Sequence, residues 1–191
     1  MFTHDDRPEK ISRPHGPEPT IRIGSVPRIV AVQSADSAEV QHLLGSLARR
    51  WIAEGRRISG VVEDIAPRVS KTCGGATLRN LMTNARYDLY QNLGAHSTAC
   101  CLDSRGVLQA CQDVLAGIHD SDMVVLSKFG KLEADRSGLL DAFIAAALLE
   151  CPVLTSVSPA YSASYLSFVG EFGAIVPPDE TYLRAWSAAV H

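Results

Sequence analysis

From residue 28 onward, short stretches that are apolar throughout alternate with longer ones in which an apolar residue recurs every three or four positions. The short stretches are typical of strands buried on both faces, and the longer ones of helices that bury one face. The pattern predicts strands at 28–32, 58–62, 123–126, 152–157 and 172–176. It predicts helices at 40–51, 104–118 and 137–149, one that opens at Ser158-Pro159, and one capped by Asp179. This alternation predicts an α/β fold, a three-layer, mostly parallel sheet with helices on both faces.

The middle of the chain departs from this alternation. Residues 77–82 and 87–91 are rich in strand-forming side chains and flank Asn84-Ala85, which predicts an inserted β-hairpin with its turn at that dipeptide. The stretch 67–75 is predicted to be a loop.

The first 26 residues differ in composition from the rest of the chain. They carry prolines at positions 8, 14, 17 and 19 among charged residues, with little apolar material for a core. Such a segment cannot offset its ordering entropy by burial. We therefore predict a disordered Pro-rich arm over 1–26 and a single α/β domain over 27–191.

Composition excludes several classes of partner. The chain of 191 residues has 18 Lys and Arg against 21 Asp and Glu, a formal charge of −3, which argues against a nucleic-acid protein that relies on bulk electrostatics. The longest strongly apolar stretch, 139–149, is about half the length of a spanning helix, and the start shows no signal-peptide pattern. The five cysteines are an odd number. Together these features predict a cytoplasmic protein with reduced thiols and with no nucleic-acid or membrane partner.

The loop after the first strand is the first candidate binding site, because ligands of parallel sheets bind beyond the carboxyl ends of the strands. Ser34 and Ser37, with the free amides of the helix that follows, can hold a small anion, although Asp36 and Glu39 would repel one. The alternative is an ordinary helix cap in which Ser34, Asp36 or Ser37 is the capping residue.

A second candidate site follows the strand at 123–126. Ser127, Lys128, Gly130 and Lys131 can gather an anion there, and Glu133 is the candidate catalytic residue, able to orient water or to pair with a lysine. The alternative is a charged, solvated loop.

Residues 91–103 contribute a third group of candidates, which includes Ser97 and Cys100 near a predicted helix start. A nucleophilic cysteine beside His96 is one hypothesis, and a small buried apolar group is the more common role of a free cysteine. Adjacent cysteines lack the spacing of a zinc site, so no metal site is predicted. Cys111 and Cys151 lie on apolar patterns and are predicted to be core residues.

Several of these segments, and above all Lys-Phe-Gly-Lys-x-Glu at 128–133, resemble a bacterial family of uncharacterised function over about 28–176. That family is related to P-loop nucleoside triphosphatases and is often encoded near molybdate-transport or nitrogen-fixation genes. The resemblance implies a P-loop-NTPase-like fold.

The motif is also similar to the Walker B region of thermophilic-type nucleoside triphosphatases, Asp-Glu-Ile-Gly-Lys-Met-Glu. By that comparison Ser127 and Lys128 replace the two acidic residues, and the loop after the first strand has no Walker A glycines or lysine. Both halves of a hydrolytic site depart from the usual pattern.

These observations leave three hypotheses for function. The preferred one is a degenerate P-loop-like protein that binds an anionic small ligand, either an oxyanion such as molybdate or a nucleotide, in metal-oxyanion or cofactor handling. The second is a divergent nucleoside triphosphatase or nucleotide transferase that uses Glu133 or Glu63. The third is a non-catalytic regulatory protein that binds a partner or forms a homo-oligomer.

Overall fold

The computed structural model describes residues 26–65, 76–89 and 104–190. In these residues seven strands form one sheet in the order β4-β3-β2-β5-β6-β1-β7. The strands are β1 (Ile29–Val32), β2 (Ile58–Ile65), β3 (Ala76–Asn80), β4 (Arg86–Asp88), β5 (Met123–Leu126), β6 (Val153–Ser156) and β7 (Gly173–Val176). The five strands from β2 to β7 in this order pair in parallel, whereas β3 is antiparallel to both β2 and β4. The mostly parallel sheet and its inserted hairpin are thereby confirmed.

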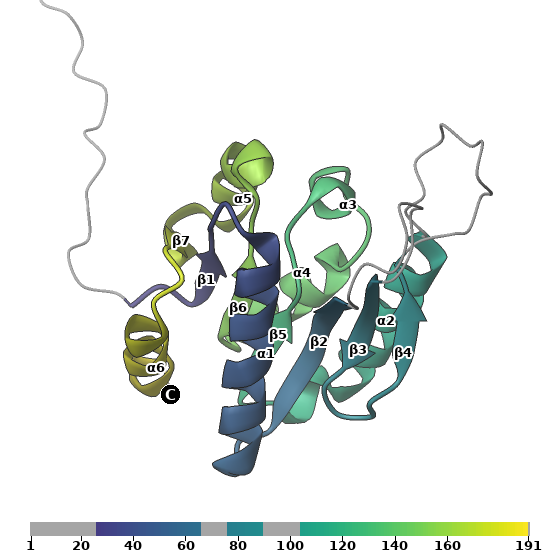
Figure 1. Cartoon of the computed structure of the whole chain (residues 1–191), viewed down its shortest axis with the longest axis horizontal. Coiled ribbons are helices and arrows are strands. Elements are labelled where there is room, and N and C mark those ends of the chain that lie inside the picture. The colour runs from purple at the N-terminus through teal and green to yellow at the C-terminus, as the bar shows by residue number, and fades with distance from the viewer. Residues whose placement is uncertain (1–25, 66–75, 90–103, 191) are drawn as a thin grey trace, which may run out of the picture.

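Helices cover both faces of the sheet, which confirms the predicted three layers (Figure 1). The side chains of α1 and α6 pack on one face, and those of α2, α4 and α5 pack on the other. The helices are α1 (Ser37–Ala53), α2 (Ser104–Gly117), α3 (Lys131–Ala134), α4 (Leu140–Leu148), α5 (Ser162–Val169) and α6 (Glu180–Ala189). Within the described ranges, no helix is long and apolar enough to cross a membrane.

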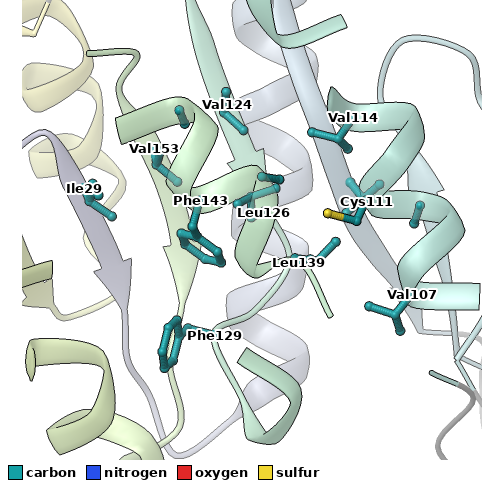
Figure 2. Close-up of a cluster of buried hydrophobic side chains, with 14 of the residues drawn as sticks. Ile29, Val107, Cys111, Val114, Val124, Leu126, Phe129, Leu139, Phe143 and Val153 are labelled. Atoms are coloured by element: carbon teal, nitrogen blue, oxygen red, sulfur yellow. The ribbon is translucent and has the colours of Figure 1, made fainter. Parts of the chain in front are cut away.

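Two buried hydrophobic clusters hold the layers together. Figure 2 shows the larger one, where Phe129 from the loop after β5 lies near Phe143 of α4. The ring centroids of this pair are 5.7 Å apart at a steep angle, a favourable edge-on contact. The Phe129 main chain also pairs with Val157 at the end of β6. The phenylalanine of the Lys-Phe-Gly-Lys segment therefore belongs to the core, and it anchors the loop that carries the two lysines. Cys111 and Cys151 are buried, as predicted.

Local signals in the sequence located some of the helix starts. Asp36 caps α1 through the amides of Ala38 and Glu39, and Asp179 caps α6 through the amide of Tyr182. The start predicted at Ser158 differs, because Pro159–Tyr161 forms a short 3₁₀ turn before α5 and the Ser158 side chain makes no capping hydrogen bond. Residues 127–136 are not a solvated loop throughout, since they contain the single turn of α3.

The β3–β4 hairpin extends the sheet sideways beyond α1, one of the two helices that cover one face of the sheet (Figure 1). In Figure 1, α1 crosses in front of the parallel strands, and β3 and β4 lie to one side of it. Side chains alternate between the two faces of a strand, so Val62, Arg79 and Arg86, which are aligned across β2, β3 and β4, share the face of α1. The charged side chains described below that the sequence did not predict as site residues lie mostly on this face, beside α1.

Candidate functional site

The start of α1 is occupied by a carboxylate of the chain itself. Asp36 Oδ1 accepts hydrogen bonds from the amides of Ala38, at 2.8 Å, and Glu39, at 3.2 Å. The Ser34 hydroxyl accepts one from the Asp36 amide at 3.2 Å, and Ser37 is exposed. The Ala38 and Glu39 amides at this helix start therefore already bind a carboxylate of the chain. The structure has the alternative arrangement, in which Asp36 is an ordinary helix cap.

Gln41, a residue that sequence reasoning missed, ties the carboxyl ends of the parallel strands together. Its side chain is 2% exposed, and its Nε2 donates to the Ser127 carbonyl at 2.7 Å and to Ser156 Oγ at 3.1 Å. Its Oε1 accepts from the Glu63 amide at 3.3 Å, and Ser156 Oγ donates to the same Ser127 carbonyl at 2.7 Å. A glutamine on the buried face of a helix, three residues before Leu44, was the available signal. Ser127, predicted as a ligand residue, is buried beneath this network.

The two lysines of the Lys-Phe-Gly-Lys segment lie in different surroundings. Lys128 is half-buried, and its Nζ is 3.7 Å from Glu63 Oε2 in an ion pair. Lys131 begins α3 and is exposed. Of these two lysines, Lys128 is the one that makes an ion pair among the described residues.

Glu133 points into its own loop rather than toward a binding site. It is 6% exposed, and its Oε2 and Oε1 accept the amides of Gly130 and Leu139, both at 2.9 Å. Burial raises the pKa of this carboxyl, and the two amides and the positive charge of Lys128 partly oppose that shift. Gly138 has φ +67°, and a Cβ on it would collide with the Glu133 carboxylate. The predicted catalytic residue and the Gly130 amide thus hold the loop in shape.

Among the described residues, an open space lies beside α1. It has a volume of about 670 Å³ and is bounded by α1, β2, β3 and β4. We call it the arginine cleft, and its lining residues are Ala38, Gln41, His42, Gly45, Arg49, Val62, Glu63, Asp64, Thr77, Arg79 and Arg86. Neither the arginines nor the cleft were predicted from the sequence.

Two of these arginines face each other across the hairpin. Arg79 and Arg86 are directly opposite in the β3–β4 register, an arrangement in which like charges repel. Asp64 moderates the repulsion, because its Oδ2 lies 3.0 Å from Arg79 Nε and 3.5 Å from Arg86 Nη2. The two neighbouring carboxylates of β2 are therefore both engaged, Glu63 with Lys128 and Asp64 with the arginines.

The third arginine comes from α1. The Arg49 side chain is exposed, and its Nη1 lies 3.5 Å from the position that a Cβ on Gly45 would take. Among the described residues it has no ion pair. Its guanidinium group thus adds a positive charge to the cleft that no carboxylate of the described residues pairs with.

Two predicted ligand residues, Ser97 and Cys100, lie outside the described residues, as do the loop predicted at 67–75 and nearly all of the arm predicted at 1–26. In the parts of the chain that the structure covers, no group of three or more His, Cys, Asp and Glu side chains could hold a metal ion.

The sheet order and the position of α1 after β1 define a P-loop-NTPase-like fold. The structure is similar to the crystal structure of THEP1 from the hyperthermophile Aquifex aeolicus, with a TM-score of 0.55 at 8% identity over 85% of this chain and 95% of that one. At so low an identity the likeness concerns the fold alone, and it confirms the predicted fold class.

Within that class, the chain belongs to the family described as "Protein of unknown function (DUF2478)", which matches residues 29–186. It is also similar to the "Molybdenum import ATP-binding protein ModC 2" of Bradyrhizobium diazoefficiens, with 31% identity over 160 residues. The match covers 83% of this chain and only 18% of that protein, so the two are distantly related over a small part of the longer one. The predicted resemblance to an uncharacterised family is confirmed.

Proposed function

We propose that the protein binds a small anionic ligand in the arginine cleft and does not hydrolyse nucleoside triphosphates. The observation that carries this proposal is the presence of Arg49, Arg79 and Arg86 around one open space. Guanidinium groups are well suited to this role, because they remain charged and match the geometry of carboxylates and oxyanions.

The charge balance of the cleft supports binding of an anion. With Lys128 at its border, the cleft has four permanent cations and two carboxylates, Glu63 and Asp64, a surplus of two positive charges. The whole chain has a formal charge of −3, so the cleft is opposite in sign to the rest of the molecule. A local positive field of this kind raises the concentration of anions at the cleft.

The proposal excludes hydrolysis because the elements that hydrolysis needs are otherwise engaged. The amides at the start of α1 are held by Asp36, and the position after β5 has Ser127 and Lys128 rather than carboxylates that could bind magnesium. Glu133 is buried with both carboxylate oxygens on main-chain amides.

The relatives suggest which process the ligand belongs to. The distantly related protein of Bradyrhizobium diazoefficiens is described as a molybdenum import ATP-binding protein. We therefore extend the proposal to metal-oxyanion or cofactor handling, and molybdate is one of the anions to test.

Isothermal titration calorimetry of the full chain with molybdate, tungstate, sulfate and phosphate tests the proposal. We expect at least one anion to bind, and Arg86→Gln to weaken that binding at least tenfold. Arg86 suits the test because its side chain is 65% exposed, so its replacement leaves the core intact. Arg184→Gln, at an exposed position on α6, is the matched control. No binding to any of these anions or to small organic phosphates, or equal weakening by the two variants, would overturn the proposal.

Phosphate release from ATP and GTP with Mg²⁺ tests the competing hydrolase hypothesis. We expect no release above a protein-free blank. Release that disappears in a folded Glu133→Gln variant would establish the hydrolase instead.

A further inference from the structure

We propose that the ligand of the arginine cleft is an elongated organic molecule that carries a phosphate or carboxylate group, rather than a bare tetrahedral oxyanion. This inference rests on the proposed function and specifies the class of ligand. The cleft lies between α1 and the strands β2, β3 and β4, and its lining reaches the start of α1 at Ala38.

The size of the cleft is the first argument. Its volume of about 670 Å³ is within the range of about 300–1,000 Å³ that is typical of sites for small organic molecules. A tetrahedral oxyanion takes the place of a few water molecules, each with a share of liquid volume of about 30 Å³. A bare oxyanion would leave most of the cleft filled with water.

The shape of the cleft is the second argument. Along α1, Ala38, Gln41, Gly45 and Arg49 line it at intervals of three or four residues, so they form one stripe of the helix. The eleven residue steps from Ala38 to Arg49 correspond to about 16 Å of helix at about 1.5 Å per residue. A ligand that contacts both ends of this stripe must be several times longer than an oxyanion.

The distribution of polarity along the cleft gives such a ligand its orientation. Arg79 and Arg86 on the hairpin form one cationic end, and their partner Asp64 is the carboxylate that an incoming acidic group would replace. The lining of the cleft also includes the uncharged residues Val62 and Gly45. An acidic group at the hairpin and an uncharged body along α1 match this arrangement.

Gly45 is an independent argument that a ligand packs against α1 in the cleft. It is buried in the middle of α1, where glycine destabilises a helix by about 1 kcal/mol relative to alanine. Its backbone does not require glycine, and an alanine Cβ would make one ordinary contact with the described residues, 3.5 Å from Arg49 Nη1. Protein packing therefore does not explain the missing side chain, whereas a ligand body against α1 does.

A series of phosphates of increasing size, each titrated into the full chain by calorimetry, tests the inference. The probes are inorganic phosphate, ribose 5-phosphate and adenosine 5′-monophosphate, which share an acidic group and differ in length. We expect affinity to rise at least tenfold from the smallest probe to the largest. A flat series in which inorganic phosphate or molybdate binds would overturn this inference and leave the proposed function standing, whereas no binding of any anion would overturn both.

Variants at Gly45 make the test specific to α1. Gly45→Leu should weaken binding of the largest probe at least tenfold and change binding of the inorganic anion less than twofold. Gly45→Ala gives a second measurement if the leucine variant fails to fold, because alanine favours the helix and should still weaken the largest probe selectively. Equal effects of either variant on all probes would overturn the inference.

Discussion

Two neighbouring regions of the molecule treat their polar groups in opposite ways. At the edge formed by the carboxyl ends of the parallel strands, Gln41, Ser156 and the Ser127 carbonyl satisfy one another, and Asp36 and Glu133 accept main-chain amides. We call this the strand-end edge. In the arginine cleft, by contrast, cations outnumber carboxylates and Arg49 has no ion-pair partner among the described residues.

The difference separates a stabilising network from a binding surface. Hydrogen bonds that are complete and buried add rigidity, and they leave nothing for a ligand to complete. Unbalanced charges beside an open space destabilise the unliganded protein slightly and favour an oppositely charged ligand. The comparison therefore predicts that changes at the strand-end edge affect stability, and that changes in the cleft affect binding.

The largest effect is expected at Gln41. Gln41→Ala leaves the Glu63 amide without its acceptor and opens a space beneath three strand ends, so we expect the free energy of unfolding to fall by about 2–4 kcal/mol. Urea denaturation measures this. His42→Ala, at the exposed neighbouring position, should change it by less than about 0.5 kcal/mol. A loss at Gln41 no larger than at His42 would show that the edge is not a stabilising network.

A smaller, pH-dependent effect is expected at Glu133. In Glu133→Gln, the side-chain NH₂ group would face one of the two main-chain N–H groups that the carboxylate now accepts. Two donors that face each other should lower the free energy of unfolding by about 1–3 kcal/mol. Because burial raises the pKa of this carboxyl, the native protein holds that proton more tightly than the unfolded chain does. The stability of the wild type relative to the glutamine variant should therefore be highest below the ordinary pKa of glutamate, about 4.3, and should decline as pH rises through the raised pKa. Denaturation of both proteins across this range measures the difference, and a difference that grows with pH would contradict the assignment.

Asp64 should change binding more than stability. Asp64→Asn removes the carboxylate that Arg79 and Arg86 share, and the two arginines then repel each other without compensation. We expect stability to fall by no more than about 1 kcal/mol, since the pair is partly exposed. Anion affinity should rise three- to tenfold and depend more steeply on salt, as measured by calorimetry. Asp135→Asn, an exposed change at the end of α3, is the control, and weaker anion binding in Asp64→Asn would contradict the role of the cleft.

The smallest effect is expected at Lys131. This residue is exposed at the start of α3, so Lys131→Ala should change stability by less than about 0.5 kcal/mol and anion affinity by less than twofold. Thermal unfolding and calorimetry on the same preparation measure both. A tenfold loss of affinity would contradict binding in the cleft and would indicate that the ligand binds at the loop after β5.

Local patterns in the sequence were sufficient for much of the fold. Uniformly apolar stretches predicted the five parallel strands, and the spacing around Asn84 predicted the hairpin, because periodicity depends on burial of one or both faces of a single element. Asp179 was identified as a cap, and Asp36 was one of three candidate caps, because the carboxylate and the amides from which it accepts hydrogen bonds are neighbours in sequence. The buried positions of Cys111 and Cys151 followed from the same periodicity.

The candidate site was decided by contacts between distant parts of the chain. Gln41 meets the Ser127 carbonyl and Ser156, 86 and 115 residues away, and the arginine cleft combines α1 with the hairpin. The direction of Glu133 depends on the amide of Leu139, which the turn at Gly138 brings back to it. The sequence by itself determined which segments become strands, helices and caps, since these depend on neighbouring residues. Which charges meet, and which polar groups are already satisfied, depended on the order of the strands and the position of α1 over them, which only the tertiary structure decided.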